Sequence, residues 1–336
     1  MSVALALPVF VVGAAVSLGA SWILVSRLER VGERLGFSEA LLGIVAALAA
    51  DAPEITSAVT ALAHHEHRTG TGVILGSNLF NLATLLGLGA LLAGGIALHR
   101  KSILLGGVVA MWVAVVSLAA VLGALSPLAC LVLALVVLFP YVAVLAAGVA
   151  GLARLRLPRG WSAWLGSAIA EEELELEAAI RPRMGRRQDA FAAAASVLVV
   201  VGASVAMERA ASSLGRRYAV PDIVIGGLVL AAVTGLPNAV TGIYLATRGR
   251  GAAAMSTALN SNTLNITVGL LIPAVVVGIG QASGQTALLA AWYIGMSAFV
   301  LALSYRDRGI RRGTGMLIIC GYLVFVGSLL ASAHAG

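Results

Sequence analysis

The sequence predicts an all-α membrane protein in which ten transmembrane helices form two inverted five-helix repeats. Three observations predict this fold. The composition is 60% hydrophobic and only 11% charged, whereas about a quarter of the residues in a soluble domain are charged. The charged residues separate apolar stretches that are each long enough to cross a hydrocarbon core of about 30 Å. Finally, the two halves of the chain share motifs at one constant offset, which indicates an internal repeat.

The apolar stretches define ten expected spans, all helical because only a helix satisfies its backbone polar groups within one segment. The first stretch is too long for a cleaved signal peptide and lacks a basic segment before it. We expect a first five-helix repeat at 1–150, a connecting loop at 151–189 and a second repeat at 190–336. The spans lie approximately at 3–24, 38–62, 72–94, 103–123, 127–150, 190–209, 220–246, 252–278, 286–304 and 314–332.

The distribution of positive charge orients these spans. Of the 22 Lys and Arg residues, 18 fall in loops on one side of the membrane and four on the other. Because cytoplasmic loops are enriched in Lys and Arg, we expect the 151–189 loop in the cytoplasm and both termini outside. The same bias explains the net charge of +7 without a nucleic-acid partner. The chain is thus expected in a prokaryotic inner (plasma) membrane, surrounded by lipid, with no obligate protein partner.

The internal repeat is the most informative property of the chain. Segment 43–57 reads GIVAALAADAPEITS, and segment 227–241, at an offset of 184, reads GLVLAAVTGLPNAVT. The same offset relates GSNLFN at 76–81 to NSNTLN at 260–265. Because each half contains five spans, an odd number, the second half enters the membrane from the opposite side. Inverted repeats are typical of secondary transporters, in which the substrate binds near the midplane where the repeats meet.

Two acidic residues, Asp51 and Glu54, fall near the middle of an apolar span. A charge at that depth costs about 2.5–3.5 kcal/mol even on the lenient insertion scale. At a spacing of three residues the two carboxylates point to one side of a helix. Protonation or a buried arginine can neutralise such a pair, but no predicted span has a Lys or Arg in its interior. The pair therefore favours a cation site.

Proline interrupts the same span and its counterpart. Pro53 and Pro237 are near the centres of their spans, where each lacks an N–H and crowds the carbonyl four residues earlier. One such proline indicates only a kink, but two at matching depth indicate helices broken for a purpose. Freed carbonyls and the negative end of a half-helix are ligands suited to Na⁺ and Ca²⁺.

Polar residues open the third and eighth spans. Serine and asparagine supply neutral oxygens that can replace the hydration shell of a cation, although hydrogen bonds between helices are the common alternative in membrane bundles. We expect Asn78 and Asn262 to brace the packing. The expected ligands of this group are Ser77, Asn81, Ser261 and Asn265.

The remaining motifs do not indicate catalysis. The run His64–His67 does not fit the helical His-Glu-x-x-His pattern, so we expect at most adventitious metal binding there. The acidic run 171–177 is expected to be a solvated helix face, with a regulatory cation sensor as the alternative. Cys130 and Cys320 fall inside predicted spans and are expected to be buried thiols. No catalytic arrangement of Ser, His and Asp occurs, so we expect neither an enzyme nor a bound cofactor.

At the repeated motifs the sequence resembles the calcium/cation antiporter superfamily, which includes sodium/calcium exchangers. The first repeat of that family typically reads GTSxPE and then GSNxxN, where residues 49–54 read AADAPE and residues 76–81 read GSNLFN. The second repeat typically reads TSxPE and then GSNxxD or GSNxxN. Here residues 234–238 read TGLPN and residues 260–265 read NSNTLN. The resemblance covers the whole expected topology, but its specific motifs cover only these segments.

The resemblance implies ten spans in two inverted halves with an ion site between them. This chain departs from the family at two positions of that site. Asn238 stands where the family usually has a second Glu, and Asp51 stands where it has a small hydroxyl residue, so both carboxylates come from the first repeat. The other residues that the resemblance implies for the site are Glu54, Ser77, Asn81, Thr234, Ser261 and Asn265, with the backbone of Ala47 and Ala231.

The leading functional hypothesis is secondary active antiport. We expect exchange of Ca²⁺ against Na⁺ or H⁺ by alternating access at a midplane site centred on Glu54, with the transported cations as its only bound ions. Three alternatives remain open, namely exchange of another cation, a passive cation channel and a membrane scaffold that does not transport. A channel differs from an exchanger because its flux does not depend on a counter-ion.

Overall fold

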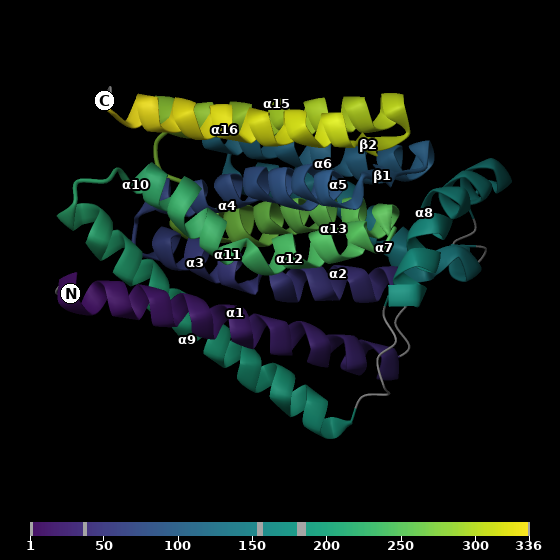
Figure 1. The fold of residues 1–336 in the computed structure, drawn as a ribbon, viewed down its shortest axis with the longest axis horizontal. Coiled ribbons are helices and arrows are strands. Elements are labelled where there is room, and N and C mark those ends of the chain that lie inside the picture. Colours follow the sequence, from purple (N-terminus) through teal and green to yellow (C-terminus); the bar gives the residue numbers. More distant parts are fainter. Residues whose placement is uncertain (1–2, 36–38, 153–156, 180–185, 335–336) are drawn as a thin grey trace.

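The first half of the chain forms a bundle of helices that run side by side along one direction (Figure 1). The computed structural model describes residues 3–35, 39–152, 157–179 and 186–334. Its first half contains α1 (Val3–Arg34), α2 (Glu39–Ala50), α3 (Ala52–Ala63), α4 (His67–Asn81), the π-helix η1 (Leu82–Leu88), α5 (Gly89–Ala93), β1 (Gly95–Ala97), α6 (Arg100–Val121) and α7 (Pro127–Gly151).

The second half is joined to the first through α8 (Arg159–Ala179), which is a helix at the predicted connecting loop. The side chains of the acidic run 171–177 lie outside the described residues. The second half contains α9 (Arg187–Arg217), α10 (Asp222–Val224), the π-helix η3 (Ile225–Leu230), α11 (Ala231–Thr234), α12 (Leu236–Thr247), α13 (Gly251–Leu264), the π-helix η4 (Asn265–Leu271), α14 (Ile272–Val277), α15 (Gly284–Asp307), β2 (Gly309–Arg311) and α16 (Arg312–His334).

The membrane-spanning elements agree with the predicted apolar stretches. Among the described residues, eight helices are long and apolar enough to cross a membrane. Two further pairs reach that length only together, since α2 and α3 meet at 54° and the helical run 222–234 meets α12 at 48°. The number of spans is therefore eight, or up to ten if each bent pair is one span.

The two bent pairs fall where Pro53 and Pro237 predict broken helices. Asp51 is the residue between α2 and α3, and Gly235 is the residue between α11 and α12. In each case the break lies two residues before the proline, because the proline is accommodated in the first turn of the following helix.

Two short strands depart from an all-α fold. Strand β1 pairs with β2 in an antiparallel two-stranded sheet, with Ile96 opposite Ile310. Gly309 has a φ of +145°, and a Cβ there would come within 2.1 Å of the Ile96 carbonyl oxygen. Strands of three residues are too short to show the alternation that identifies a strand in a sequence.

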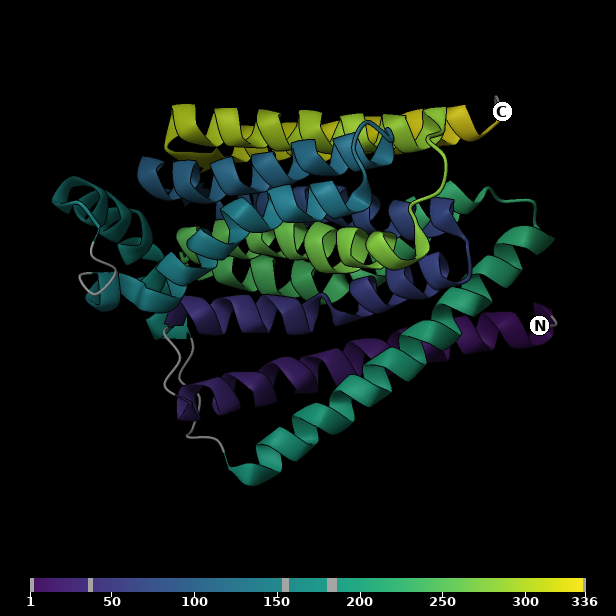
Figure 2. The same cartoon turned by 180° about the vertical axis from the view of Figure 1, so that it is seen from behind.

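The ends of the bundle are distinct. The first residue of α1 and the last residue of α16 lie at one end, and α8 lies at the other (Figures 1 and 2). The sheet of β1 and β2 lies at the α8 end (Figure 1). We call this the arginine-rich end, because it carries the Arg34 end of α1 and the 305–313 connection.

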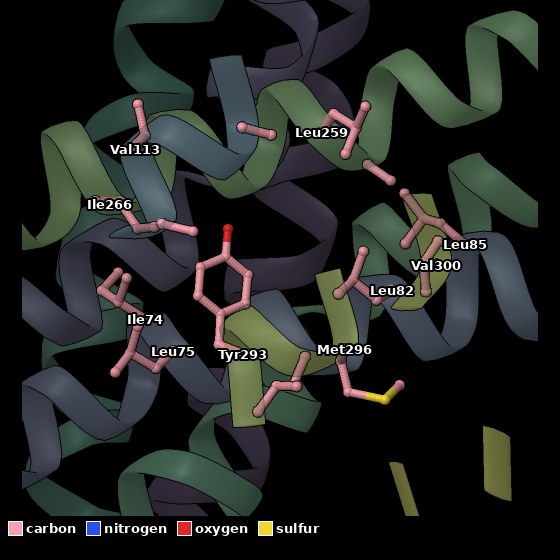
Figure 3. Close-up of a cluster of buried hydrophobic side chains, with 14 of the residues drawn as sticks. Ile74, Leu75, Leu82, Leu85, Val113, Leu259, Ile266, Tyr293, Met296 and Val300 are labelled. Carbon is pink, nitrogen blue, oxygen red and sulfur yellow. The ribbon is translucent and has the colours of Figure 1, made fainter. Parts of the chain in front are cut away.

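The core lies around α4 and α13. In the most apolar window of His67–Ala93, 83% of the residues are buried, against 28% for α1, so α4 is central and α1 is peripheral. Tyr293 of α15 lies among buried side chains of α4, α6 and α13, as Figure 3 shows. At Gly76 of α4 a Cβ would come within 2.2 Å of the carbonyl oxygen of Gly227 in η3, so α4 and η3 touch through their backbones.

Candidate cation-binding site

The first side of the site is built at the break between α2 and α3. Pro53 leaves the Ala49 carbonyl without a donor from the next turn, and the Ser21 hydroxyl of α1 donates to that carbonyl at 3.1 Å. Asp51 lies at the break and Glu54 lies in the first turn of α3. Both side chains are fully buried.

The second side is built in the same way from the other half of the chain. Asn238 lies in the first turn of α12, just after Pro237, and it is fully buried. It therefore occupies the place in its bent pair that Glu54 occupies in the first pair. Ser261 and Asn265, which are also fully buried, lie at the end of α13 and the start of η4.

These polar groups of the second half hold the carboxylates of the first half. The Asn238 amide nitrogen donates to Asp51 Oδ1 at 2.6 Å and to Glu54 Oε1 at 3.3 Å. The Ser261 hydroxyl donates to the same oxygen of Asp51. The Asn265 amide donates to Glu54 Oε2. The structure thus brings together five of the residues that the sequence predicts for the site.

A symmetric pair of asparagines lies beside the carboxylates. Asn78 donates its amide to the Asn262 carbonyl oxygen at 3.0 Å, and Asn262 donates to the Asn78 carbonyl oxygen at 3.1 Å. The two residues are 184 positions apart, which is the repeat offset, so equivalent residues make equivalent bonds. Asn265 also donates to the Asn78 side-chain oxygen at 3.2 Å, which links this pair to Glu54.

The site contains buried oxygens with no hydrogen-bond partner among the described residues. Leaving such atoms unpaired is costly, and oxygen is the ligand that Ca²⁺ and other hard cations prefer. The group combines one carboxylate oxygen with amide and hydroxyl oxygens, so it can coordinate a cation from several directions. Its members are Asp51 Oδ2, Ser57 Oγ, Ser77 Oγ, Asn81 Oδ1, Asn238 Oδ1 and Asn265 Oδ1.

Ser77 and Asn81 lie on α4, which packs against α3, η3 and α11 of the two bent pairs, and both are fully buried. The Asn81 amide nitrogen donates to the Ser261 hydroxyl oxygen at 3.2 Å, which leaves the Asn81 amide oxygen free for a ligand. Ser57, one turn after Glu54 on α3, is a member of this oxygen group that sequence reasoning missed. Its spacing of three residues from Glu54 is the signal that places it on the same helix face.

The backbone ligands implied by the resemblance are less available than expected. The Ala47 carbonyl accepts the Asp51 N–H at 2.8 Å, and the Ala231 carbonyl accepts the Gly235 N–H at 3.0 Å. Thr234 is buried, and its hydroxyl donates to a carbonyl one turn earlier at 2.8 Å. Each of these oxygens still has a second lone pair, so it can coordinate a cation without giving up its hydrogen bond within the helix.

The charge of the site is not balanced by the protein. Among the described residues, neither Asp51 nor Glu54 takes part in an ion pair. No group of three or more His, Cys, Asp and Glu side chains is placed to hold a metal in the described part of the chain. A cation bound at this site is therefore held by two carboxylates and by neutral oxygens.

A cavity borders the site on one side. It has a volume of about 300 Å³ and is lined by residues of α1, α2, α12 and α13, among them Ala47, Ala50 and Asn238. On α1 its lining extends to Glu29, close to the Arg34 end of that helix. The cavity therefore lies between the central site and the arginine-rich end of the bundle.

The histidine-rich turn after α3 lies at the other end and makes protein contacts. The Nδ1 of His64 donates to the Thr60 carbonyl at 2.7 Å, and Arg209 donates to the Nε2 of the same ring at 3.0 Å. Glu66 pairs with Arg216 at 2.8 Å. These contacts tie the turn to α9.

The π-helices near the site were not predicted. Segment η1 begins directly after Asn81, and η4 begins at Asn265, so equivalent positions of the two halves both widen the helix. Such π-helical segments are rare and are frequently found at functional sites. Sequence offers no residue pattern that distinguishes them from ordinary helix.

The fold and this site define a class, namely a polytopic helical membrane protein with a buried, oxygen-lined carboxylate site between two bent helices. Solved structures share the fold. An H⁺/Ca²⁺ exchanger crystal structure matches with a TM-score of 0.68 and 14% identity, over 98% of this chain and 87% of that chain. The sodium-calcium exchanger NCX_Mj, in crystals soaked with Na⁺ and Sr²⁺, matches with a TM-score of 0.63 and 20% identity, over 97% and 99%.

Sequence comparison gives the family. The sodium/calcium exchanger protein family matches residues 5–152 and 190–331, and the chain belongs to this family. A curated human relative, sodium/potassium/calcium exchanger 1, is 30% identical over 94 residues, which are 28% of this chain. That match covers 9% of the length of the human protein.

Proposed function

We propose that the chain is a secondary active antiporter that exchanges Ca²⁺ against Na⁺ or H⁺ by alternating access at the site of Asp51 and Glu54. One observation carries this proposal: two fully buried carboxylates, with no ion-pair partner among the described residues, face unpaired amide and hydroxyl oxygens. Family membership supports the same function, and the two similar structures are exchangers by name.

The donor set suits a hard divalent cation. Ca²⁺ takes six to eight oxygens in flexible geometry, and the site offers two carboxylates beside the neutral oxygens of Ser77, Asn81 and Asn238. Two negative charges offset the charge of one Ca²⁺, of two Na⁺ or of two protons. Exchange between these ions therefore leaves the buried site near neutrality in each state, which a low-dielectric environment requires.

The asparagines provide a way to alternate between ligand and donor. In this structure Asn238 and Asn265 turn their amide nitrogens to the carboxylates and leave their oxygens unpaired. Rotation of each amide about its last side-chain bond exchanges the nitrogen and the oxygen. We infer that the amide nitrogens stabilise the carboxylates when a cation leaves and that the amide oxygens coordinate the cation when it binds.

We propose the finer topology as ten spans in two inverted five-helix repeats, at 1–150 and 190–336. The reciprocal bonds of Asn78 and Asn262, one repeat offset apart, support this assignment. The two bent pairs support it as well, because each supplies one side of the site. We place the arginine-rich end in the cytoplasm and both termini outside, in a prokaryotic inner (plasma) membrane, from the distribution of Arg and Lys.

Flux through proteoliposomes tests the proposed function. Purified protein is reconstituted, and ⁴⁵Ca²⁺ uptake is measured with internal Na⁺, with an internal acid load, and with internal choline at neutral pH. Exchange predicts uptake only when Na⁺ or protons are inside, and it identifies the coupling ion. Equal uptake in all three conditions indicates a channel, and absence of uptake in all three contradicts Ca²⁺ exchange.

A further inference from the structure

A second carboxylate position lies in the cavity that borders the central site. Glu29 lines this cavity together with Asn238, so the same space adjoins both residues. The predicted first span ended at residue 24, which placed Glu29 in a loop. In the structure α1 continues to Arg34, and Glu29 is part of a helix face.

The α1 residues of the cavity wall follow helical periodicity. Trp22, Val25, Ser26 and Glu29 are spaced at positions i, i+3, i+4 and i+7, and all four line the cavity. Residues at these spacings share one face of a helix. Trp22 and Glu29 are therefore about 10 Å apart along the helix axis, on the same face.

The two arginines that are neighbours of Glu29 in the sequence pair with another acidic residue. Arg27 and Arg30 both direct a nitrogen to Asp189 of α9, at 2.6 and 3.4 Å. Within the part of the chain that the structure describes, Glu29 takes part in no ion pair.

Neutral oxygens lie on the remaining wall of the cavity. The hydroxyls of Ser26, Thr241 and Thr257 donate to carbonyls of their own helices at 2.8–2.9 Å. Their donor capacity is used, so the side that they present to a ligand is an acceptor. The rest of the described lining is largely apolar, and among the described lining residues Glu29 is the one carboxylate.

We propose that Glu29 is the centre of a second cation-binding site, which holds a partly hydrated mono- or divalent cation between the arginine-rich end of the bundle and the central carboxylates. A carboxylate in a mostly apolar cavity attracts cations and repels anions, because the wall screens its charge less than bulk water does. The site's role in transport rests on the proposed function. Cation binding at Glu29 does not.

Terbium luminescence tests this site without transport. Bound Tb³⁺ is excited through a nearby indole, and Trp22 lies on the same helix face as Glu29. The chain has four other tryptophans, so the Trp22-dependent signal is defined as the part of the Tb³⁺ luminescence that the Trp22→Phe substitution removes. Titrations use detergent-solubilised full-length protein in which Asp51→Asn and Glu54→Gln remove the central carboxylates.

The proposal predicts that the Trp22-dependent signal persists in the Asp51→Asn/Glu54→Gln protein and that Ca²⁺ competes with it. Adding Glu29→Gln raises the Tb³⁺ dissociation constant at least about tenfold, which is the loss expected when the one charged ligand is removed. Glu66→Gln, which removes a carboxylate outside the cavity lining at the other end of the bundle, leaves the constant within about threefold. The proposal is overturned if the Trp22-dependent signal is already lost when only Asp51 and Glu54 are substituted. It is also overturned if the signal survives after Glu29→Gln is added.

Transport kinetics separate this inference from the proposed function. In proteoliposomes Glu29→Gln is expected to raise the KM for Ca²⁺ presented at the arginine-rich end severalfold, with kcat and the KM from the opposite side unchanged. If wild-type protein shows no exchange but keeps the Glu29-dependent Tb³⁺ signal, the proposed function fails and the second site stands. If exchange is normal and the Glu29-dependent Tb³⁺ signal is absent, the second site fails and the proposed function stands.

Discussion

At the scale of single residues, Asn238 connects the two carboxylates. Its amide nitrogen reaches Asp51 Oδ1, Glu54 Oε1 and the Ser261 hydroxyl, at 2.6, 3.3 and 3.2 Å. A carboxylate at this position would add a third negative charge to a buried site that has no ion-pair partner among the described residues. We propose that Asp51 supplies, from the first half of the chain, the charge that position 238 of the second half lacks.

A double-mutant cycle tests this compensation. Asp51→Ser removes one of two charges that hold a divalent cation, so Ca²⁺ exchange is expected to fall about tenfold or more, which corresponds to about 1.4 kcal/mol. Adding Asn238→Glu restores a second carboxylate beside the Ser261 hydroxyl, and part of the exchange is expected to return. Asn238→Glu alone places three carboxylates together and is expected to lower the thermal stability of the calcium-free protein.

Two results would count against compensation. The first is wild-type Ca²⁺ exchange by the Asp51→Ser protein, and the second is a double variant that is no better than the single one. A different role for Asp51 has its own signature, because two neighbouring acids can share one proton. If Asp51→Ser flattens the pH dependence of exchange and keeps Na⁺-driven flux, Asp51 couples protons and does not compensate for position 238.

Sequence reasoning reached most of these residues because buried charge is conspicuous in an apolar span. Asp51 and Glu54 stand out for the cost of their burial, and the repeat offset leads from them to Asn238. Contacts across the two halves, such as the short approach of Asn238 to Asp51, depend on how the bent pairs pack and have no sequence pattern. Glu29 was missed because charged residues after an apolar stretch were assigned to a loop.

At the scale of elements, α4 and the run from α10 to α11 approach each other through glycine. A Cβ at Gly76 would meet the Gly227 carbonyl oxygen at 2.2 Å, which no adjustment of side chains relieves. Gly76→Ala is therefore expected to lower the free energy of unfolding by about 1–3 kcal/mol. It should also lower exchange, since Ser77 follows directly on α4.

Gly295→Ala on α15 is the matched control for this substitution. A Cβ there meets nothing within 4 Å, and alanine in an open helical position is favoured over glycine by about 0.5–1 kcal/mol. The measurement is the apparent melting temperature in detergent, with exchange assayed in parallel. A Gly76→Ala protein as stable as the Gly295→Ala protein contradicts the close backbone contact.

Element boundaries followed the sequence where a strong local cause exists. Pro53 and Pro237 fix the positions of both breaks to within two residues. The ends of α1 and α9 did not follow, since both helices continue beyond their apolar stretches, to Arg34 and Arg217. Charged residues form helix readily at the membrane surface, so hydropathy marks the edge of the hydrocarbon core and not the end of the helix.

At the scale of the whole molecule, the two ends of the bundle are expected on opposite sides of the membrane. Tyr218, directly after α9, and Gly160, near the start of α8, are both exposed. The connection between α9 and α10 and helix α8 lie at opposite ends of the bundle (Figure 1). Cysteine is introduced at each position in a background with Cys130→Ser and Cys320→Ser. A membrane-impermeant maleimide is expected to label position 218 in intact spheroplasts and position 160 only after permeabilisation.

Labelling of both positions from the same side would contradict the inverted arrangement. Labelling of position 160 alone in intact spheroplasts would keep the arrangement and reverse its orientation. The helical membrane fold follows from the composition, and the two broken helices follow from Pro53 and Pro237. The short sheet of β1 and β2, by contrast, joins residues more than 200 positions apart, and local sequence carries no signal for such pairing.

The dependence of exchange on Glu54 tests the central claim most directly. Counter-ion-driven ⁴⁵Ca²⁺ uptake is measured in proteoliposomes that contain wild-type, Glu54→Gln or His65→Ala protein, the last as a control in the exposed turn. Removing one charge of a buried ion site costs about 3–5 kcal/mol, so Glu54→Gln is expected to reduce exchange at least about a hundredfold. Its melting temperature should be unchanged, and His65→Ala should exchange normally. Exchange at the wild-type rate by well-folded Glu54→Gln protein would contradict the account.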